Sequence, residues 1–384
     1  MKIFQATLAK LAIGVMGCLI FAVPRLAFSQ APRSPTPTSV NGTVRAESVA
    51  RGLEHPWALA FLPDGKILVT ERPGRLRTIE RNRVSKPLAG VPLVFARGQG
   101  GLLDIALDPR FTENRLVYLS YAEPGEGSTA GTAVARGRLG EGKLEEVRVI
   151  YRQQPKVEGG SHFGSRLVFA RDGTLFVTQG DRGRRERAQD LSSGLGKIVR
   201  LNSDGSVPKD NPFVGRSGAL PEIWSYGHRN VQSAALHPET SQLWTVEHGA
   251  RGGDELNHPE AGKNYGWPVI TYGVDYSGAK IGEGTARPGM EQPVYYWDPV
   301  IAPSGMAFYT GDVFPGWKGS ILVGSLTPGL LVKLTLKGGK VAREERYLGD
   351  LRERIRDVQQ GPNRFIYLVT DSRDGSVLRV RTSR

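Results

Sequence analysis

The chain has 384 residues, with 49 glycines, 25 prolines and 39% hydrophobic residues, which is enough apolar material for a large core. Turn-forming residues at this frequency exclude a helical bundle. The net charge of +13 at pH 7 favours anionic partners. No Lys/Arg block, zinc-knuckle spacing or helix-turn-helix pattern occurs, so the sequence does not indicate nucleic-acid binding.

Residues 1–29 have the pattern of a secretory signal peptide. Lys2 and Lys10 supply the positive start, Leu11–Val23 is apolar, and small residues stand at 27 and 29. The apolar run is too short for a confident membrane span, so we expect no stable membrane insertion and a periplasmic or secreted protein. The only cysteine, Cys18, lies inside this segment, so the mature chain has no disulfides.

Residues 30–43 are rich in proline, serine and threonine (QAPRSPTPTSVNG over 30–42). This composition predicts a flexible tether that is not part of the fold. The remaining residues, 44–384, show no internal boundary. We therefore expect one large catalytic domain there.

A strand-turn-strand pattern begins at Trp57–Thr70 (WALAFLPDGKILVT). It recurs in five further copies, which are Leu103–Tyr121, Arg166–Gln179, Gln232–Glu247, Gly305–Gly324 and Ile355–Thr370. The second strands of the six copies start near residues 67, 116, 175, 243, 321 and 366, with hairpin-type turns before them. This repeat predicts an all-β fold, a six-bladed β-propeller of four-stranded antiparallel blades. A stacked pair of β-sandwiches is the alternative.

Polar loops precede several of these copies, at 99–103, 159–164, 227–230 and 354–357. In a propeller they would occupy equivalent places in successive blades and point at one central pocket. His162, between glycines in the second loop, is the best candidate for a general base, although a histidine bonded to its own turn is the alternative. Arg229, Arg354 and Arg356 form a cationic set suited to a carboxylate-bearing ligand, or else belong to a charged edge strand.

The acidic pair Asp254 and Glu255, close to Asn257, suggests a metal site built from oxygen ligands. Calcium takes six to eight oxygens, many of them main-chain carbonyls, so a sequence reveals only part of such a site. No His/Cys spacing indicates zinc.

Several longer motifs make the chain from about Val44 onward resemble the soluble pyrroloquinoline quinone (PQQ)-dependent sugar dehydrogenases, in their aldose sugar dehydrogenase branch. They are HPWALAFLPDG, GQGGLLDIALDP, SHFGSRLVFARDG, SYGHRN, EHGARGGDELN, KNYGWP, PSGMAFY and RIRDV. The resemblance implies a six-bladed propeller that binds PQQ over its central pocket together with calcium. It implies oxidation of aldose sugars at C1 to the lactone, with electrons passed to an external acceptor.

The same resemblance assigns roles to residues of this chain. His162 would take the proton of the C1 hydroxyl, and Arg229 would stabilise negative charge on the quinone. The residues implied to hold the cofactor are Gln99, Arg229, Asn230, Tyr276, Arg354 and Arg356. The main-chain oxygens of Gly249 and Ala250 would bind the catalytic calcium. Glu255 and the main chain of Tyr265 would bind a second, structural calcium.

One departure from the family bears on cofactor affinity. The family commonly has a lysine in the loop after the fifth-blade strand, where this chain has Thr327. An alternative function is therefore a non-catalytic carbohydrate- or protein-binding propeller that has lost PQQ binding. A calcium-dependent lactone hydrolase is a third reading, less favoured because the pocket loops offer Gln, His and Arg rather than carboxylates. A monomer and a homodimer are both compatible with the sequence.

Overall fold

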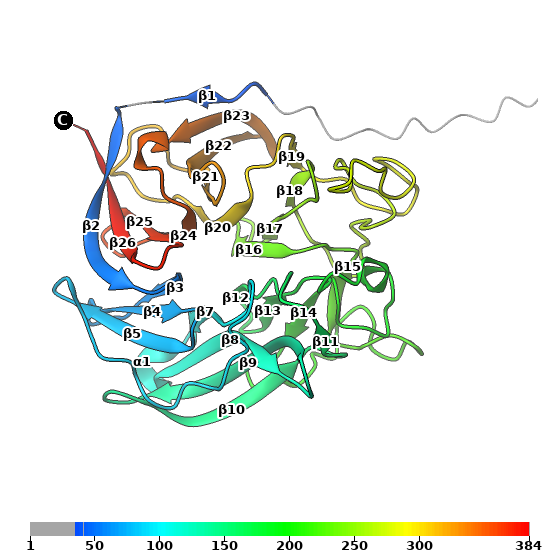
Figure 1. Ribbon diagram of the computed structural model, residues 1–384, viewed down its shortest axis with the longest axis horizontal. Helices are drawn as coiled ribbons and strands as arrows, with labels where there is room; N and C mark the ends of the chain where they lie inside the picture. The colour runs from blue at the N-terminus through cyan, green and yellow to red at the C-terminus, as the bar shows by residue number, and fades with distance from the viewer. Residues whose placement is uncertain (1–34, 41, 384) are drawn as a thin grey trace, which may run out of the picture.

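The computed structural model describes residues 35–40 and 42–383, and its strands form six sheets arranged around one axis (Figure 1). Each sheet contains a blade of four antiparallel strands, with its innermost strand nearest the axis and its outermost at the rim, and two of the sheets have one short additional strand. The first strands of adjacent blades contact one another in a closed ring. The predicted six-bladed β-propeller is therefore confirmed.

The strands run in chain order from blade 1 to blade 6. Blade 1 contains β3 (Pro56–Phe61), β4 (Ile67–Glu71), β5 (Arg75–Glu80) and β6 (Arg83–Val84). Blade 2 contains β7 (Leu102–Leu107), β8 (Leu116–Pro124), β9 (Thr129–Leu139) and β10 (Leu144–Arg152), with the short β11 (Val157–Glu158) paired to β9. Blade 3 contains β12 (Leu167–Phe169), β13 (Leu175–Thr178), β14 (Lys197–Leu201) and β15 (Ile223–Tyr226).

The second half of the chain continues this order. Blade 4 contains β16 (Val231–Leu236), β17 (Leu243–Glu247), β18 (Asp254–Asn257) and β19 (Tyr295–Trp297). Blade 5 contains β20 (Pro303–Phe308), β21 (Ile321–Ser325), β22 (Leu331–Lys337) and β23 (Lys340–Tyr347). The helical pieces in the described residues are α1 (Phe111–Asn114) and two 3-10 turns, η1 (Arg185–Ala188) and η2 (Gly349–Leu351). No described helix has the length and apolar character needed to span a bilayer.

Blade 6 is assembled from both ends of the chain. β24 (Ile355–Gln360), β25 (Ile366–Thr370) and β26 (Gly375–Thr382) supply its inner three strands. Its outer strand is β2 (Val44–Leu53), which pairs antiparallel with β26 (Figure 1). The first and last strands of the domain therefore close the ring against each other.

The predicted tether is wrong for part of its length. β1 (Thr38–Ser39) pairs in parallel with β23, and the Val40 amide donates to the Arg346 carbonyl at 2.9 Å. These bonds involve main-chain atoms, so the polar composition of the segment does not prevent them. The predicted signal peptide, residues 1–29, lies outside the described residues.

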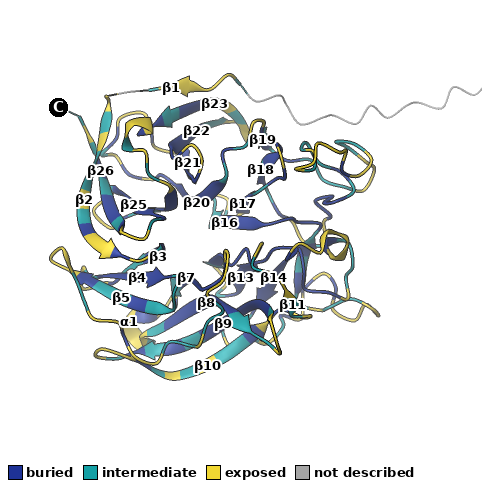
Figure 2. Cartoon of the chain, viewed as in Figure 1, coloured by how far each residue is buried: buried dark blue, intermediate teal, exposed yellow. Residues whose placement is uncertain are grey.

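The second strands of the blades are almost entirely buried, whereas an outer strand such as β23 mixes exposed, intermediate and buried positions (Figure 2). Blades pack face to face, so an inner strand is covered on both sides and reads as a continuous apolar run. This is why the predicted second-strand starts coincide with the first residues of β4, β8, β13, β17, β21 and β25.

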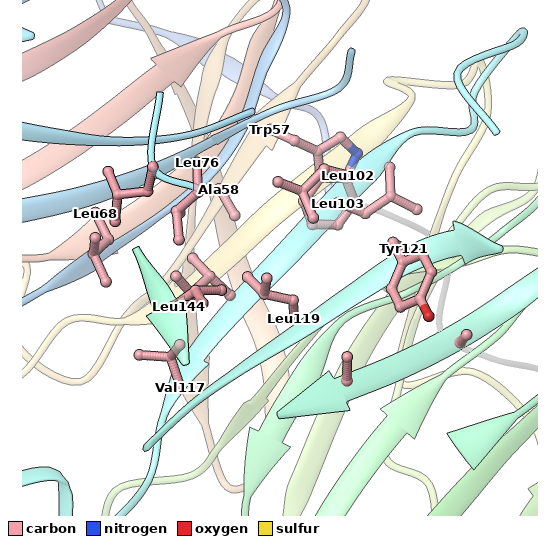
Figure 3. Close-up of a cluster of buried hydrophobic side chains, with 14 of the residues drawn as sticks. Trp57, Ala58, Leu68, Leu76, Leu102, Leu103, Val117, Leu119, Tyr121 and Leu144 are labelled. Carbon is pink, nitrogen blue, oxygen red and sulfur yellow. The ribbon is translucent and has the colours of Figure 1, made fainter. Parts of the chain in front are cut away.

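The core lies between neighbouring blades. Trp57, Leu68 and Leu76 of blade 1 pack with Leu102 and Leu119 of blade 2 in one buried cluster (Figure 3). Burying each such leucine contributes about 1.5–3 kcal/mol. This packing fixes the angle between blades, and with it the positions of the loops at the axis.

Candidate active site

A cavity of about 150 Å³ lies where the first strands of the blades begin. All six blades, or the loops leading into them, contribute to its lining through Trp57, Leu103, Gly164, Gln232, Ala302 and Arg356. Gln99 and Arg354 also line it. Three of the four polar loops expected to converge, 99–103, 159–164 and 354–357, contribute residues to this cavity, whereas Gly227 and Arg229 of the fourth loop, 227–230, line a separate small cavity.

His162 is held beside this cavity, since the two residues that follow it line the cavity wall. Its main-chain amide donates to Oε1 of Gln99 at 2.7 Å, and its Nδ1 lies 2.6 Å from Oδ1 of Asp181. An ionised carboxylate only accepts hydrogen bonds, so Nδ1 carries a proton, and in the neutral ring Nε2 is the nitrogen with the lone pair. The histidine is thus oriented in the tautomer that a general base requires.

Asp181, which the sequence analysis did not single out, is buried below this imidazole. Its Oδ1 also accepts from the Gly183 amide at 2.8 Å, and its Oδ2 accepts from Nε1 of Trp267 at 2.8 Å. Burial raises the pKa of Asp181, but the hydrogen bonds from His162, Gly183 and Trp267 outweigh burial and hold that pKa below its usual value. The carboxylate is therefore ionised at neutral pH.

Arg182 fixes the loop that carries His162. Its guanidinium donates to the Ser161 carbonyl and, at 2.7 Å, to the Gly159 carbonyl. Its guanidinium carbon lies 3.6 Å from the centre of the Phe163 ring. Burial lowers the pKa of Arg182 to about 10, so it remains charged at neutral pH. One buried cation therefore holds the main chain before His162 and the ring after it.

Arg229 is buried in blade 4 and points toward the end of β17. Its Nη1 donates to the carbonyl of Gly249 and, at 3.2 Å, to that of His248. Its guanidinium carbon lies 5.3 Å from the centre of the Trp267 ring. Tyr276, which is 70% exposed, accepts from Nη2 at 3.4 Å through its hydroxyl. Tyr276 therefore covers Arg229 from the solvent side.

Arg354, which immediately precedes β24, and Arg356, within β24, reach the same carboxylate. Arg354 Nη2 lies 3.4 Å and Arg356 Nη2 2.7 Å from Oδ2 of Asp371. Arg356 is buried and also donates to Oε1 of Gln232 at 3.0 Å, while its Nε has no partner among the described residues. Asp371 was also missed by the sequence analysis.

Two further side chains complete the site. Asn230 is buried and accepts from the Gly164 amide at 3.1 Å, whereas its Nδ2 has no partner in the described part of the chain. His248 lines the cavity and donates from Nε2 to the Pro303 carbonyl at 2.7 Å. Burial, with nearby arginines, lowers the pKa of His248 to about 3, so its ring is neutral at physiological pH.

A family model described as "Glucose / Sorbosone dehydrogenase" matches residues 53–379. The chain belongs to this family. Over 344 residues, it is 48% identical to the aldose sugar dehydrogenase YliI of Escherichia coli (strain K12), covering 88% of this chain and 93% of the relative.

Solved structures of the glucose/sorbosone dehydrogenase family have the same fold. A crystal structure of a glucose dehydrogenase superimposes with a TM-score of 0.86 at 53% identity, covering 87% of this chain and 99% of that chain. The PQQ-bound form of an aldose sugar dehydrogenase from Streptomyces coelicolor superimposes with a TM-score of 0.73 at 29% identity, covering 89% of this chain and 99% of that chain. The family resemblance seen in the sequence motifs is confirmed.

Three of the four residues that the family resemblance implies for calcium line one cavity. Gly249, Glu255 and Tyr265 line one small cavity of about 10 Å³, together with the carboxylate of Glu247. Ala250 instead packs in an apolar cluster with Ala188, Trp267 and Ile281. Burial and the neighbouring Glu247 raise the pKa of Glu255 to about 8.

This donor set fits calcium chemically, because carbonyl and carboxylate oxygens are the ligands that calcium prefers. Two carboxyl groups beside one cavity, Glu247 buried and Glu255 half-buried, also favour a cation there. No group of three or more His, Cys, Asp or Glu side chains in the described residues is arranged to hold a metal, so main-chain oxygens and water would have to complete the set.

Thr327, the departure from the family pattern, lies on the exposed loop after β21. The preceding residue, Leu326, lines the central cavity, and its carbonyl accepts from Arg354 Nη1 at 3.3 Å. Arg354 therefore contacts the main chain of the residue next to Thr327. A positive charge from blade 6 reaches the blade 5 loop.

Proposed function

We propose that this protein is a PQQ- and calcium-dependent aldose dehydrogenase that oxidises the sugar C1 to the lactone. The observation that carries the proposal is His162, oriented by Asp181 beside an axial cavity lined by Arg354 and Arg356. Membership of the glucose/sorbosone dehydrogenase family and the PQQ-bound relative support the cofactor.

The residues at the axis fit PQQ, a flat molecule with three carboxylates. Arg354 and Arg356 supply cations, and Gln99 lines the same cavity. The Nε of Arg356 and the Nδ2 of Asn230 are buried donors without partners among the described residues, as donors awaiting an acceptor would be. Carboxylate oxygens bind such donors in charge-assisted hydrogen bonds.

In this proposal His162 removes the proton of the C1 hydroxyl with Nε2. The chemistry that PQQ with calcium supplies when bound is two-electron oxidation, by acceptance of the hydride that leaves C1. As the C1–H bond breaks, C1 forms a double bond to its oxygen and the product is the lactone. Asp181 stabilises the imidazolium that results, because its ionised carboxylate lies 2.6 Å from Nδ1.

Arg229 would supply a fixed positive charge beside the quinone oxygen on which negative charge develops. The carbonyls of Gly249 and His248 hold its guanidinium in place before reaction. A cation preorganised in this way needs no reorganisation as the charge forms.

The experiment is a titration of purified protein with PQQ and calcium, followed by turnover of aldoses with an artificial dye. We expect activity only when both are present. His162→Ala should lower kcat by roughly 10² to 10⁴ without abolishing PQQ binding. His237→Ala, in the turn between β16 and β17 at the far end of blade 4, is the control and should leave kcat unchanged. Activity without PQQ and calcium, or a His162→Ala variant with full activity, would contradict the proposal.

Thr327 favours a second candidate, a propeller that binds carbohydrate or protein without catalysis. The same titration separates the two functions. Saturable PQQ binding at micromolar concentrations supports the dehydrogenase, whereas no saturation below millimolar supports the binding propeller.

The proposal also places the enzyme outside the cytoplasm. Residues 1–29 would direct export and be removed, and an external acceptor would take the electrons from the cofactor. Amino-terminal sequencing of protein purified from a periplasmic fraction tests the cleavage after residue 29.

A further inference from the structure

Trp267 contacts both halves of the site. Its indole Nε1 donates to Oδ2 of Asp181 at 2.8 Å, and the guanidinium carbon of Arg229 lies 5.3 Å from its ring centre. Asp181 follows β13 in blade 3, whereas Arg229 precedes β16 in blade 4. Trp267 itself lies in the long connection between β18 and β19. One side chain therefore joins the carboxylate behind the base to the separate cation.

The main chain of Trp267 is fixed on both sides. Its amide donates to the Gly227 carbonyl at 2.9 Å, and its carbonyl accepts from Nε2 of Gln189 at 2.8 Å. Its ring is 7% exposed and packs with Ala188, Ala250 and Ile281. The indole is therefore a rigid support rather than a mobile cover.

The hydrogen bond from Trp267 determines the orientation of the Asp181 carboxylate. Oδ1 of Asp181 accepts from His162 and the Gly183 amide, while Trp267 is the one donor to Oδ2 in the described part of the chain. A planar carboxylate bonded at both oxygens cannot rotate about its terminal bond. The Nδ1–H of His162, which bonds the same carboxylate, is then held in one direction.

We propose that Trp267 is a positioning residue that fixes the His162–Asp181 pair and Arg229 relative to each other. The role in catalysis rests on the proposed dehydrogenase function, but the positioning itself is a property of the protein without cofactor or sugar. The indole N–H orients His162 through Asp181, and the indole face positions the guanidinium of Arg229. The N–H contact can be removed alone, and the contribution of the face follows from comparing a variant that lacks both contacts with one that lacks only the N–H.

Trp267→Phe removes the N–H and keeps an aromatic face beside Arg229. Trp244→Phe is the matched control, because Trp244 is also buried in blade 4 but its Nε1 has no partner among the described residues. The readout is the ¹⁵N NMR spectrum of histidine-labelled protein without PQQ or sugar, with His162 assigned from a His162→Gln variant. We expect the His162 ring nitrogens to shift or broaden in Trp267→Phe and to stay unchanged in Trp244→Phe.

Unchanged His162 signals in Trp267→Phe would show that the indole N–H does not position His162, whatever the activity of the variant. If Trp267→Phe does not fold, Asp181→Asn provides the second measurement. The indole N–H resonance of Trp267 should shift in Asp181→Asn relative to the wild type, and an unshifted resonance would overturn the proposal equally.

The second contact is tested by the dissociation constant of PQQ. Trp267→Leu, which loses the aromatic face, should raise this constant about tenfold, while Trp267→Phe should stay within about twofold of the wild type. An unchanged dissociation constant of PQQ in folded Trp267→Leu would show that the indole face does not position Arg229. With sugar present, Trp267→Phe should lower kcat about tenfold at unchanged KM. If the wild type does not bind PQQ, the proposed function fails, but the NMR comparison still decides the positioning role.

Discussion

The guanidinium carbon of Arg182 lies 3.6 Å from the centre of the Phe163 ring, one residue after His162. Arg182→Met should keep the bulk of the side chain and remove its bonds to the Ser161 and Gly159 carbonyls. Hydrogen bonds to charged groups contribute about 1.5–3 kcal/mol each, so for the two bonds we expect a loss of about 3–6 kcal/mol in unfolding free energy, measured with urea. We also expect a fall of about tenfold in kcat, because the loop carrying His162 is released.

Arg182→Lys should recover part of both losses, since the ammonium can still donate to one carbonyl. Arg184→Met, on an exposed side chain two residues away, is the control and should change neither quantity. Equal behaviour of the Arg182 and Arg184 variants would show that the guanidinium does not hold the loop.

Asp371→Asn should destabilise the protein at neutral pH. Burial raises the pKa of Asp371, but the charge and hydrogen bond of Arg356 outweigh it and hold that pKa well below its usual range. Removing the carboxylate leaves Arg356 buried without its counter-charge, which typically costs about 3–5 kcal/mol. Urea unfolding at pH 7 measures the loss.

The same substitution predicts a pH dependence. A carboxyl whose folded-state pKa is depressed stabilises the fold above its unfolded pKa, about 3.9, and the contribution disappears as pH falls through the folded pKa. The stability difference between the wild type and Asp371→Asn should therefore be largest at neutral pH and shrink below about pH 4. A difference that stays constant from pH 7 to pH 3 would count against the ion pair.

Thr327→Lys should tighten the binding of PQQ. Thr327 is exposed on the loop whose Leu326 lines the central cavity, so a lysine there can reach an acidic ligand. A charged contact contributes about 1–3 kcal/mol, which corresponds to a gain of roughly 5- to 150-fold in affinity. Isothermal titration with PQQ measures it.

Thr240→Lys adds the same charge to an exposed turn at the far end of blade 4 and controls for net charge. If both variants gain affinity equally, the effect is long-range attraction. If Thr327→Lys gains nothing, the loop does not face the cofactor.

Calcium should stabilise the protein through Glu255. We expect the thermal midpoint of the wild type to rise with calcium and fall with a chelator, because a ligand at 100 times its Kd stabilises by about 2.7 kcal/mol. Glu255→Gln should lose most of this response, since it removes one of the two carboxyl groups at the small cavity. Glu260→Gln, which is exposed in the same segment, should respond like the wild type. A full calcium response in Glu255→Gln would place the ion elsewhere.

The fold could be predicted because inner strands are covered on both faces. Ile67, Leu175 and Ile366 each open an apolar run, and a run of that kind indicates where a blade lies even without an alignment. The pairing of Thr38–Ser39 could not be predicted in this way. It depends on the free edge of β23, which only the folded structure reveals.

The candidate site was predictable only in part. His162, Arg229 and Arg356 stand out because their residue types are unusual in glycine-rich or apolar surroundings. Asp181 was missed because Gly-Asp-Arg-Gly reads as an ordinary turn. Trp267 was missed as a site residue because its partners come from two other segments of the chain, and contacts between blades leave no local pattern.

The pairing of β2 with β26 has a consequence for the order of maturation. Arg356 and Asp371 belong to the last blade, and that blade is complete only when Val44–Leu53 has paired with the final strand. The binding site of a ligand that contacts all six blades is therefore complete only after the whole chain has been synthesised. Binding of the proposed cofactor would consequently be a late event that follows formation of the last strand.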